Sequence, residues 1–244
     1  MNFELFSEQD LLEKINEFNK LYKEKPIKDN NGGMKSAHLF SSWFVMQKYK
    51  PKYIIESGIF KGQGTWFFEK ASPDSIIISI DIDLNQRVYK SKKVKYTTTD
   101  FLDSNWEDVE KDNCIIFFDD HQNSIERIKH AKKLGFKKMM FEDNYPSEVG
   151  DCYSPKKIIS NKKYYINKEI YEPNIEDYNY FVNNVKTYYE FPPLFKSDKT
   201  RWRDVWNEKY PTKTELLNEN LKDKYPTFWS EKMDYTWICF IELN

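Results

Sequence analysis

Short apolar runs alternate with amphipathic stretches through the middle of the chain. The clearest run is Cys114–Phe118, and similar runs lie at 53–56, 76–80, 94–98 and 138–141. Unbroken apolar runs of this length predict strands that are buried on both faces, as in parallel sheets. Helices are expected between them, at 64–70, 84–89, 105–110 and 125–134. The pattern predicts an α/β fold with a Rossmann-like, mostly parallel sheet and helices on both faces.

The flanking segments follow other patterns. A variant capping box at Ser7 and Asp10 predicts a helix to about Lys23, and a second helix is expected from Met34 to about Lys48. Beyond Pro146, residues 147–174 look irregular, and a helix is expected over Ile175–Tyr188. Phe191–Phe195 starts or flanks a strand, and Tyr235–Leu243 is expected to form the final strand. We expect one domain over 1–244: an N-terminal helical extension (1–50), a cofactor-binding core (51–146), an aromatic-rich substrate or lid region (147–234) and a last strand (235–244).

Composition narrows the classes of protein that this chain can belong to. There are 38 Lys and Arg against 39 Asp and Glu, so no basic excess indicates nucleic acid as a partner. No apolar stretch is long enough for a membrane span, and the first twenty residues lack the apolar run of a signal peptide. Three scattered cysteines form neither a disulfide framework nor a zinc-finger spacing. We expect a cytoplasmic protein, and the sequence is compatible with a homo-oligomer.

The strongest candidate for a binding site follows the first expected strand. Glu56-Ser57-Gly58 and Lys61-Gly62-Gln63-Gly64-Thr65 place an acidic residue on the strand and three glycines in the turn to a helix. Glycine permits a tight turn and close approach of a ligand. The spacing differs from the dinucleotide pattern G-x-G-x-x-G. A strand carboxylate would repel a pyrophosphate but suits the cationic groups of S-adenosylmethionine, although an ordinary strand-to-helix turn with an acidic helix cap is the simpler alternative.

Two further carboxylates support the cofactor hypothesis. Asp81 ends the second strand, where it could accept hydrogen bonds from ribose hydroxyls. Asp100 ends the third, where it could meet the exocyclic amine of adenine. The predicted cofactor-binding residues are therefore Glu56, Gly58, Gly62, Gly64, Asp81 and Asp100.

Paired acidic residues follow the fourth and fifth strands. Asp119-Asp120-His121 and Glu142-Asp143 should meet at one sheet edge, where clustered carboxylates repel one another unless a cation lies among them. Oxygen ligands without thiols favour Mg²⁺ or another hard divalent cation. His121 is the candidate general base. Asp-Asp acting as a helix cap, with His121 merely solvated, is the alternative.

Other polar residues give weaker signals. His38 on the second helix could face the pocket but is more simply a packed or surface histidine, and His130 reads as a residue on a solvated helix face. Arg201-Trp202-Arg203 with Trp206 could form a lid or an anion clamp, or only pack. Cys114 is expected in the core.

With these motifs the sequence resembles the class I S-adenosylmethionine-dependent methyltransferases. More narrowly, it is similar to the branch of macrocin- and novobiocin-type sugar O-methyltransferases and cephalosporin hydroxylase proteins. The resemblance covers residues 50 to 146 and rests on Ile55–Gly58, Lys61–Thr65, Ser79–Asp83, Phe118–His121 and Phe141–Tyr145. It implies a metal held by Asp119 or Asp120 with Glu142 and Asp143. The branch often places histidine three residues after the aspartate, whereas His121 follows Asp119 by two and Asp120 by one, so either the metal ligand or the base departs from the pattern of the branch.

The expected function is transfer of a methyl group from S-adenosylmethionine to a hydroxyl of a small molecule, a sugar or sugar-like group, with help from Mg²⁺ or another hard divalent cation. The predicted catalytic residues are His121 and Asp120, and the predicted metal ligands are Asp119, Glu142 and Asp143. A non-catalytic ligand-binding or interaction protein of the same fold is one alternative. A nicotinamide-dependent oxidoreductase is another, although its G-x-G-x-x-G loop is absent.

Overall fold

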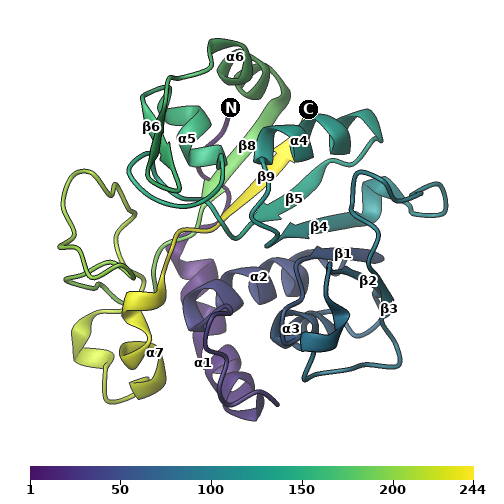
Figure 1. The fold of residues 1–244 in the computed structure, drawn as a ribbon. Coiled ribbons are helices and arrows are strands. Elements are labelled where there is room, and N and C mark those ends of the chain that lie inside the picture. The colour runs from purple at the N-terminus through teal and green to yellow at the C-terminus, as the bar shows by residue number, and fades with distance from the viewer.

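The strands expected from the sequence form one sheet in the computed structural model, which describes residues 1–244 (Figure 1). The sheet has seven strands in the order β3-β2-β1-β4-β5-β9-β8. Its first five strands are parallel, whereas β9 runs antiparallel to both of its neighbours. The mostly parallel sheet is therefore confirmed. The bounds are β1 (Tyr53–Ser57), β2 (Ile76–Ile80), β3 (Lys95–Thr97), β4 (Cys114–Phe118), β5 (Lys138–Phe141), β8 (Val185–Glu190) and β9 (Cys239–Leu243).

Helices cover both faces of the sheet, as Figure 1 shows. Successive strand residues point to opposite faces, so Ile54 packs in one apolar core and Ile55 in the other. The larger core lies under α1 (Glu8–Glu24), α2 (Ser36–Tyr49) and α3 (Gln63–Ala71). The smaller core lies under α4 (Ser124–Lys133), α5 (Pro155–Ser160) and α6 (Ile175–Asn184).

The N-terminal helices begin and pack as their sequence predicts. Asp10 N–H donates to Ser7 Oγ at 3.1 Å and Ser7 N–H donates to Asp10 Oδ2 at 3.0 Å, which is the expected capping box. The ring of Phe18 then packs 5.3 Å from Phe40 and 5.5 Å from Phe67, between centroids. Large aromatic side chains thus join α1, α2 and α3 into one layer.

The prediction of two short helices, at 84–89 and 105–110, is wrong. Only a 3₁₀ turn, Leu84–Gln86, forms within 84–89, and residues 105–110 form turns before a second 3₁₀ turn at Lys111–Asn113. Local side-chain hydrogen bonds explain the second case: Asn105 Oδ1 accepts from Glu107 N–H, and Trp106 Nε1 donates to Phe101 O. These bonds compete with the helical pattern.

The second half is more regular than expected. Residues 147–174 contain α5 and a hairpin of β6 (Tyr164–Ile166) and β7 (Glu169–Tyr171). The predicted helix 175–188 ends at Asn184, and the chain continues directly as β8, which residues 191–195 then flank. The last strand begins at Cys239 rather than Tyr235, after 3₁₀ turns at Glu219–Leu221 and Lys232–Asp234 and the short α7 (Pro226–Ser230). None of the helices combines the length and apolarity needed to cross a bilayer.

Candidate active site

A cavity opens where the order of the strands reverses. From β1 the chain proceeds outward to β2 and β3, whereas β4 and β5 lie on the other side of β1. The register aligns the strand ends, since Ser57 pairs with both Ile80 and Phe118, and Phe118 pairs with Phe141. The crevice beyond the carboxyl ends at such a reversal is where open α/β sheets bind ligands. We call this the first cavity; its volume is about 370 Å³.

The glycine turn after β1 forms one wall of the first cavity. Gly58 has a φ of +97°, and a Cβ there would lie 1.9 Å from the carbonyl oxygen of Asp119. Only glycine therefore lets the ends of β1 and β4 approach this closely. Asp81 holds the turn in place, because its Oδ2 accepts from the backbone N–H groups of Ile59 at 2.8 Å and Phe60 at 2.9 Å. Both Gly58 and Asp81 line the cavity, as predicted for a cofactor site.

Glu56 and the other two glycines lie behind that wall. The buried carboxylate of Glu56 accepts from the hydroxyls of Thr65 and Ser79, each at 2.6 Å. Burial raises its pKa to about 7. A Cβ on Gly64 would meet Glu56, and one on Gly62 would meet the backbone of Tyr89. In the structure these three residues support the turn, and their direct contact with a cofactor stays a prediction.

An arginine that the sequence analysis missed neutralises two of the strand-end carboxylates. Arg127, on α4, makes a bidentate pair with Asp100 at 2.6 and 2.7 Å and reaches Asp120 at 2.9 Å. Asp120 also accepts from Ser57 Oγ at 2.7 Å. The Arg127 hydrogen bonds lower the pKa of Asp100, whereas burial raises the pKa of Asp120 against the opposing effect of Arg127. Asp100 lines the cavity, but its carboxylate already has a cationic partner.

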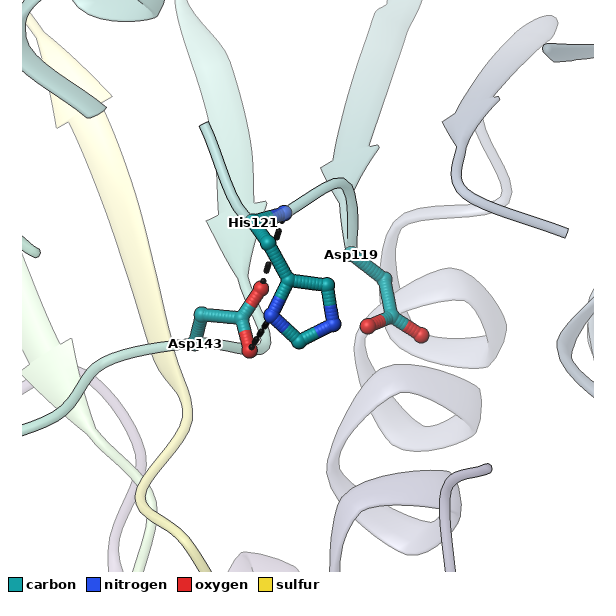
Figure 2. A group of neighbouring side chains, drawn as sticks. All are labelled: Asp119, His121 and Asp143. Atoms are coloured by element: carbon teal, nitrogen blue, oxygen red, sulfur yellow. Dashed lines mark hydrogen bonds and ion pairs between the residues drawn. The ribbon is translucent and has the colours of Figure 1, made fainter. Parts of the chain in front are cut away.

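A possible cation site lies at the edge of the first cavity. The ligand atoms of Asp119, His121 and Asp143 all lie within 4.8 Å of one another, and Figure 2 shows the imidazole between the two carboxylates. Burial, with the nearby Glu142 and Asp143, raises the pKa of Asp119 well above its ordinary value. Burial and Glu142 likewise raise the pKa of Asp143. Both shifts have the same cause, because neighbouring carboxylates in a buried place disfavour one another's charged form.

Asp143 provides the test of whether a cation fits. Its Oδ1 atom is buried and has no hydrogen-bond partner, although it lies 3.3 Å from His121 Nδ1. Its Oδ2 atom accepts from the His121 backbone N–H at 3.2 Å. A buried acceptor without a donor is costly unless something else satisfies it, and an oxygen-oxygen-nitrogen set suits a hard divalent cation. The residues therefore fit a metal.

Glu142, the third predicted metal ligand, is not in the group whose ligand atoms lie within 4.8 Å of one another, and its carboxylate is held by His38 instead. His38 Nδ1 lies 2.6 Å from Glu142 Oε1, with both side chains buried. Burial alone would favour the neutral acid, but His38 outweighs it and the pKa of Glu142 is lowered. His38, which stood out only weakly in the sequence, is thus in direct contact with Glu142, a predicted metal ligand.

His121 connects the first cavity to a second one. It is half exposed, has a φ of 53°, and lies 3.2 Å from the carboxylate of Asp151, whose hydrogen bond raises its pKa to about 9. Left-handed backbone in a residue with a side chain is uncommon and concentrates at functional sites. A general base must start unprotonated, and the pairing with Asp151 favours the protonated ring. The role of His121 as the base stays a prediction.

The second cavity, of about 600 Å³, lies beside the first and shares His121 and Arg201 with it. Its wall includes the edge-to-face pair of Tyr145 and Trp202, whose centroids are 5.8 Å apart. Of the segment that the sequence suggested as a lid or anion clamp, Arg201 lies at the junction of the two cavities and Trp202 in the wall of the second. Trp206 lies elsewhere, packed against Trp237. Asp151 and Tyr165, both outside the predicted site, also line the second cavity.

No protein-family model matches the sequence, and no curated protein matches it. Solved structures with a related fold include CmcI with Mg and SAM, which is 20% identical with a TM-score of 0.38 over 49% of this chain and 58% of that protein. An O-methyltransferase from Bacillus cereus in complex with SAH is 14% identical, with a TM-score of 0.45 over 98% and 92%. The O-methyltransferase TomG from Streptomyces achromogenes, with SAM, is 14% identical, with a TM-score of 0.39 over 57% and 67%. The match to CmcI spans less than two thirds of that protein.

Proposed function

We propose that this chain transfers a methyl group from S-adenosylmethionine to a hydroxyl of a sugar-like small molecule, with assistance from a divalent cation. The observation that carries the proposal is the meeting of two cavities at His121. One cavity lies at the strand-order reversal against a glycine turn, and the other has aromatic and charged walls. A group of possible cation ligands lies at their junction. A two-substrate transfer needs this arrangement, because donor and acceptor must meet with their reacting atoms in line.

The first cavity suits the methyl donor. Its volume falls within the range of small-molecule sites, and its wall combines Gly58 with the carboxylates of Asp81 and Asp100. Because Asp100 is paired with Arg127, attraction for the sulfonium and ammonium groups of the donor would come from Asp81 and Asp119 in the same wall. Asp81 Oδ2 accepts from the two N–H groups of the glycine turn, and Oδ1 accepts from the Asp83 N–H at 3.0 Å. Because a carboxylate offers about four lone-pair positions, Oδ1 can still accept from a ribose hydroxyl.

The second cavity suits the acceptor. Aromatic faces such as Tyr145 and Trp202 pack on the apolar faces of a sugar ring, while carboxylates such as Asp151 accept hydrogen bonds from its hydroxyls. Arg201 lines both cavities, so its guanidinium can pair with a negatively charged group of either ligand. This composition supports a polyhydroxylated acceptor over a purely apolar one.

The cation would be held by Asp119, Asp143 and one more donor from His121 or Glu142. When bound, it would orient an acceptor hydroxyl and lower the pKa of that hydroxyl. In the transfer the hydroxyl oxygen forms the new bond to the methyl carbon, and the sulfur keeps the electron pair of the bond that breaks. The hydroxyl proton passes to a protein base, for which His121 and Asp120 are the candidates; only His121 also lines the acceptor cavity. Aromatic walls exclude water from the reacting atoms.

Calorimetry of the purified chain tests the proposal. Micromolar binding of S-adenosylmethionine, without binding of NAD⁺, is the expected result, and Mg²⁺ should give a separate signal. Absence of S-adenosylmethionine binding with and without Mg²⁺ would refute the methyl-transfer function. Binding without turnover on any hydroxyl acceptor would favour the non-catalytic alternative.

Asp143→Asn separates the cation from the cofactor. It should abolish methyl transfer and weaken Mg²⁺ binding, while S-adenosylmethionine affinity stays nearly intact, because Asp143 does not line the first cavity. The exposed Asp112→Asn is the matched control. Equal loss of both affinities would mean that Asp143 serves the fold rather than a cation.

A further inference from the structure

His38 joins three segments that are distant in the sequence. It lies on α2, is 2% exposed, and packs edge-on against the ring of Tyr235 at 5.5 Å between centroids. Its Nδ1 atom is 2.6 Å from Glu142 Oε1, just after β5. Its Nε2 atom is 3.0 Å from the backbone nitrogen of Thr236, which precedes β9. Both polar atoms of a buried imidazole are thus used, in two directions.

These two contacts define where the ring proton is. The Thr236 backbone N–H can only donate, so Nε2 must be the acceptor. The proton of the neutral ring is then on Nδ1, where it is donated to the Glu142 carboxylate. Rotation of the ring would lose both hydrogen bonds in a buried environment, which is costly. The tautomer and the orientation of His38 are therefore fixed by the fold.

We infer that His38 is a positioning residue, which holds the Glu142 carboxylate in place for the cation bound at Asp119 and Asp143. The inference rests on the proposed function, because it requires that a divalent cation binds there. Glu142 lines the first cavity with Asp119 and directly precedes Asp143 in the chain. A carboxylate among others of its charge is repelled from them. The donor from His38 opposes that repulsion at a defined oxygen, and residues in this role are known to change metal affinity when they are removed.

The sharpest test is Mn²⁺ binding to the ligand-free full chain, by calorimetry and by electron paramagnetic resonance. His38→Leu should weaken Mn²⁺ binding by about 10- to 100-fold, and Glu142→Gln should weaken it at least as much. His38→Asn should bind nearly as the wild type, because its amide N–H₂ stands close to the position of Nδ1 and keeps a donor for Glu142. His130→Leu, a histidine on α4 outside both cavities, is the control and should change nothing.

Circular dichroism first establishes that each variant folds. If His38→Leu does not fold, His38→Gln replaces it, since the longer amide reaches toward Thr236 but offers no donor at the Nδ1 position. Its Mn²⁺ affinity should then fall while that of His38→Asn does not.

Unchanged Mn²⁺ affinity in His38→Leu, with weaker binding in Glu142→Gln, would overturn the inference and leave the proposed function standing. Unchanged affinity in Glu142→Gln would also overturn it, because there would be no ligand to position. A wild type that binds no Mn²⁺ would overturn both the inference and the cation part of the proposed function. Calorimetry with S-adenosylmethionine would then decide the methyl-transfer part separately.

Discussion

Replacing Glu56 by glutamine should stabilise the free protein above neutral pH. The Glu56 carboxylate is buried behind the glycine turn, and burial raises its pKa from the ordinary 4.5 to about 7. Between these two values the folded chain holds a proton that the unfolded chain has released. Stability from this residue is therefore complete below pH 4.5 and is lost as the pH rises to about 7, after which it stays constant.

The magnitude follows from the size of the shift. Each pKa unit corresponds to about 1.4 kcal/mol, so the charged form costs on the order of 3 kcal/mol at pH 8. Glutamine has no charge to bury, and its carbonyl oxygen can still accept from the hydroxyls of Thr65 and Ser79. For a chain of this length about 3 kcal/mol corresponds to roughly 6–12 °C in Tm.

Thermal and urea unfolding of the ligand-free protein, measured from pH 4.5 to pH 8.5, is the assay. The wild type should lose stability relative to Glu56→Gln as the pH rises, and the gap should be constant above about pH 7.5. Glu69→Gln is a suitable control, because Glu69 also accepts from two hydroxyls, those of Tyr89 and Ser91, but is only partly buried. If Glu56→Gln were less stable than the wild type at pH 8, or if the gap did not vary with pH, the reasoning from burial would be wrong.

Two further substitutions probe the walls of the first cavity. Arg127→Met should destabilise the fold by about 3 kcal/mol in urea unfolding, because it leaves the partly buried Asp120 without its cation. Lys133→Met, on the exposed side of the same helix, should change stability by less than about 0.5 kcal/mol, and equal effects would contradict the ion-pair argument. Gly58→Ala should lower the free energy of unfolding by more than about 4 kcal/mol or prevent folding, whereas Gly135→Ala should lower it by only about 1–2 kcal/mol. Both positions have a positive φ, but only a Cβ on Gly58 would meet backbone atoms. Similar losses of Tm in the two variants would show that φ alone decides.

The sequence predicted the parallel core because apolar runs and strand-end carboxylates are local features. Asp81, Asp119 and Asp143 could be placed at one edge of the sheet from strand counting alone. Which of Asp119 and Asp120 belongs to the group of candidate cation ligands could not be decided, since it depends on Arg127, which pairs with Asp120 from a helix. Arg127 is the single arginine in a lysine-rich helix. Because arginine, unlike lysine, can bind a carboxylate through two parallel hydrogen bonds, its presence there could have predicted a paired aspartate.

Contacts that span the whole chain were beyond the sequence pattern. His38 lies in an amphipathic stretch, where the sequence suggested a packed or surface histidine, and only the fold brings it to Glu142 and Thr236. Asp151 lies in a segment that looked irregular, so its pairing with His121 had no periodic signal. Strand β8 was missed because it follows α6 without a break, and its pairing with β9 is what makes it a strand.

The position of β9 has a consequence for how the sheet is assembled during synthesis. Its residues pair with β5, so that Cys239 meets Phe141 almost a hundred residues earlier, and with β8 on the other side. Until the ribosome has delivered residues 239–243, β5 is an open edge with unpaired backbone groups and β8 has no neighbour in the sheet. Non-local pairing of this kind slows folding, and an open strand edge invites pairing with other chains. A nascent chain that stalls before residue 239 should therefore depend on chaperones, although its whole parallel core has already been made.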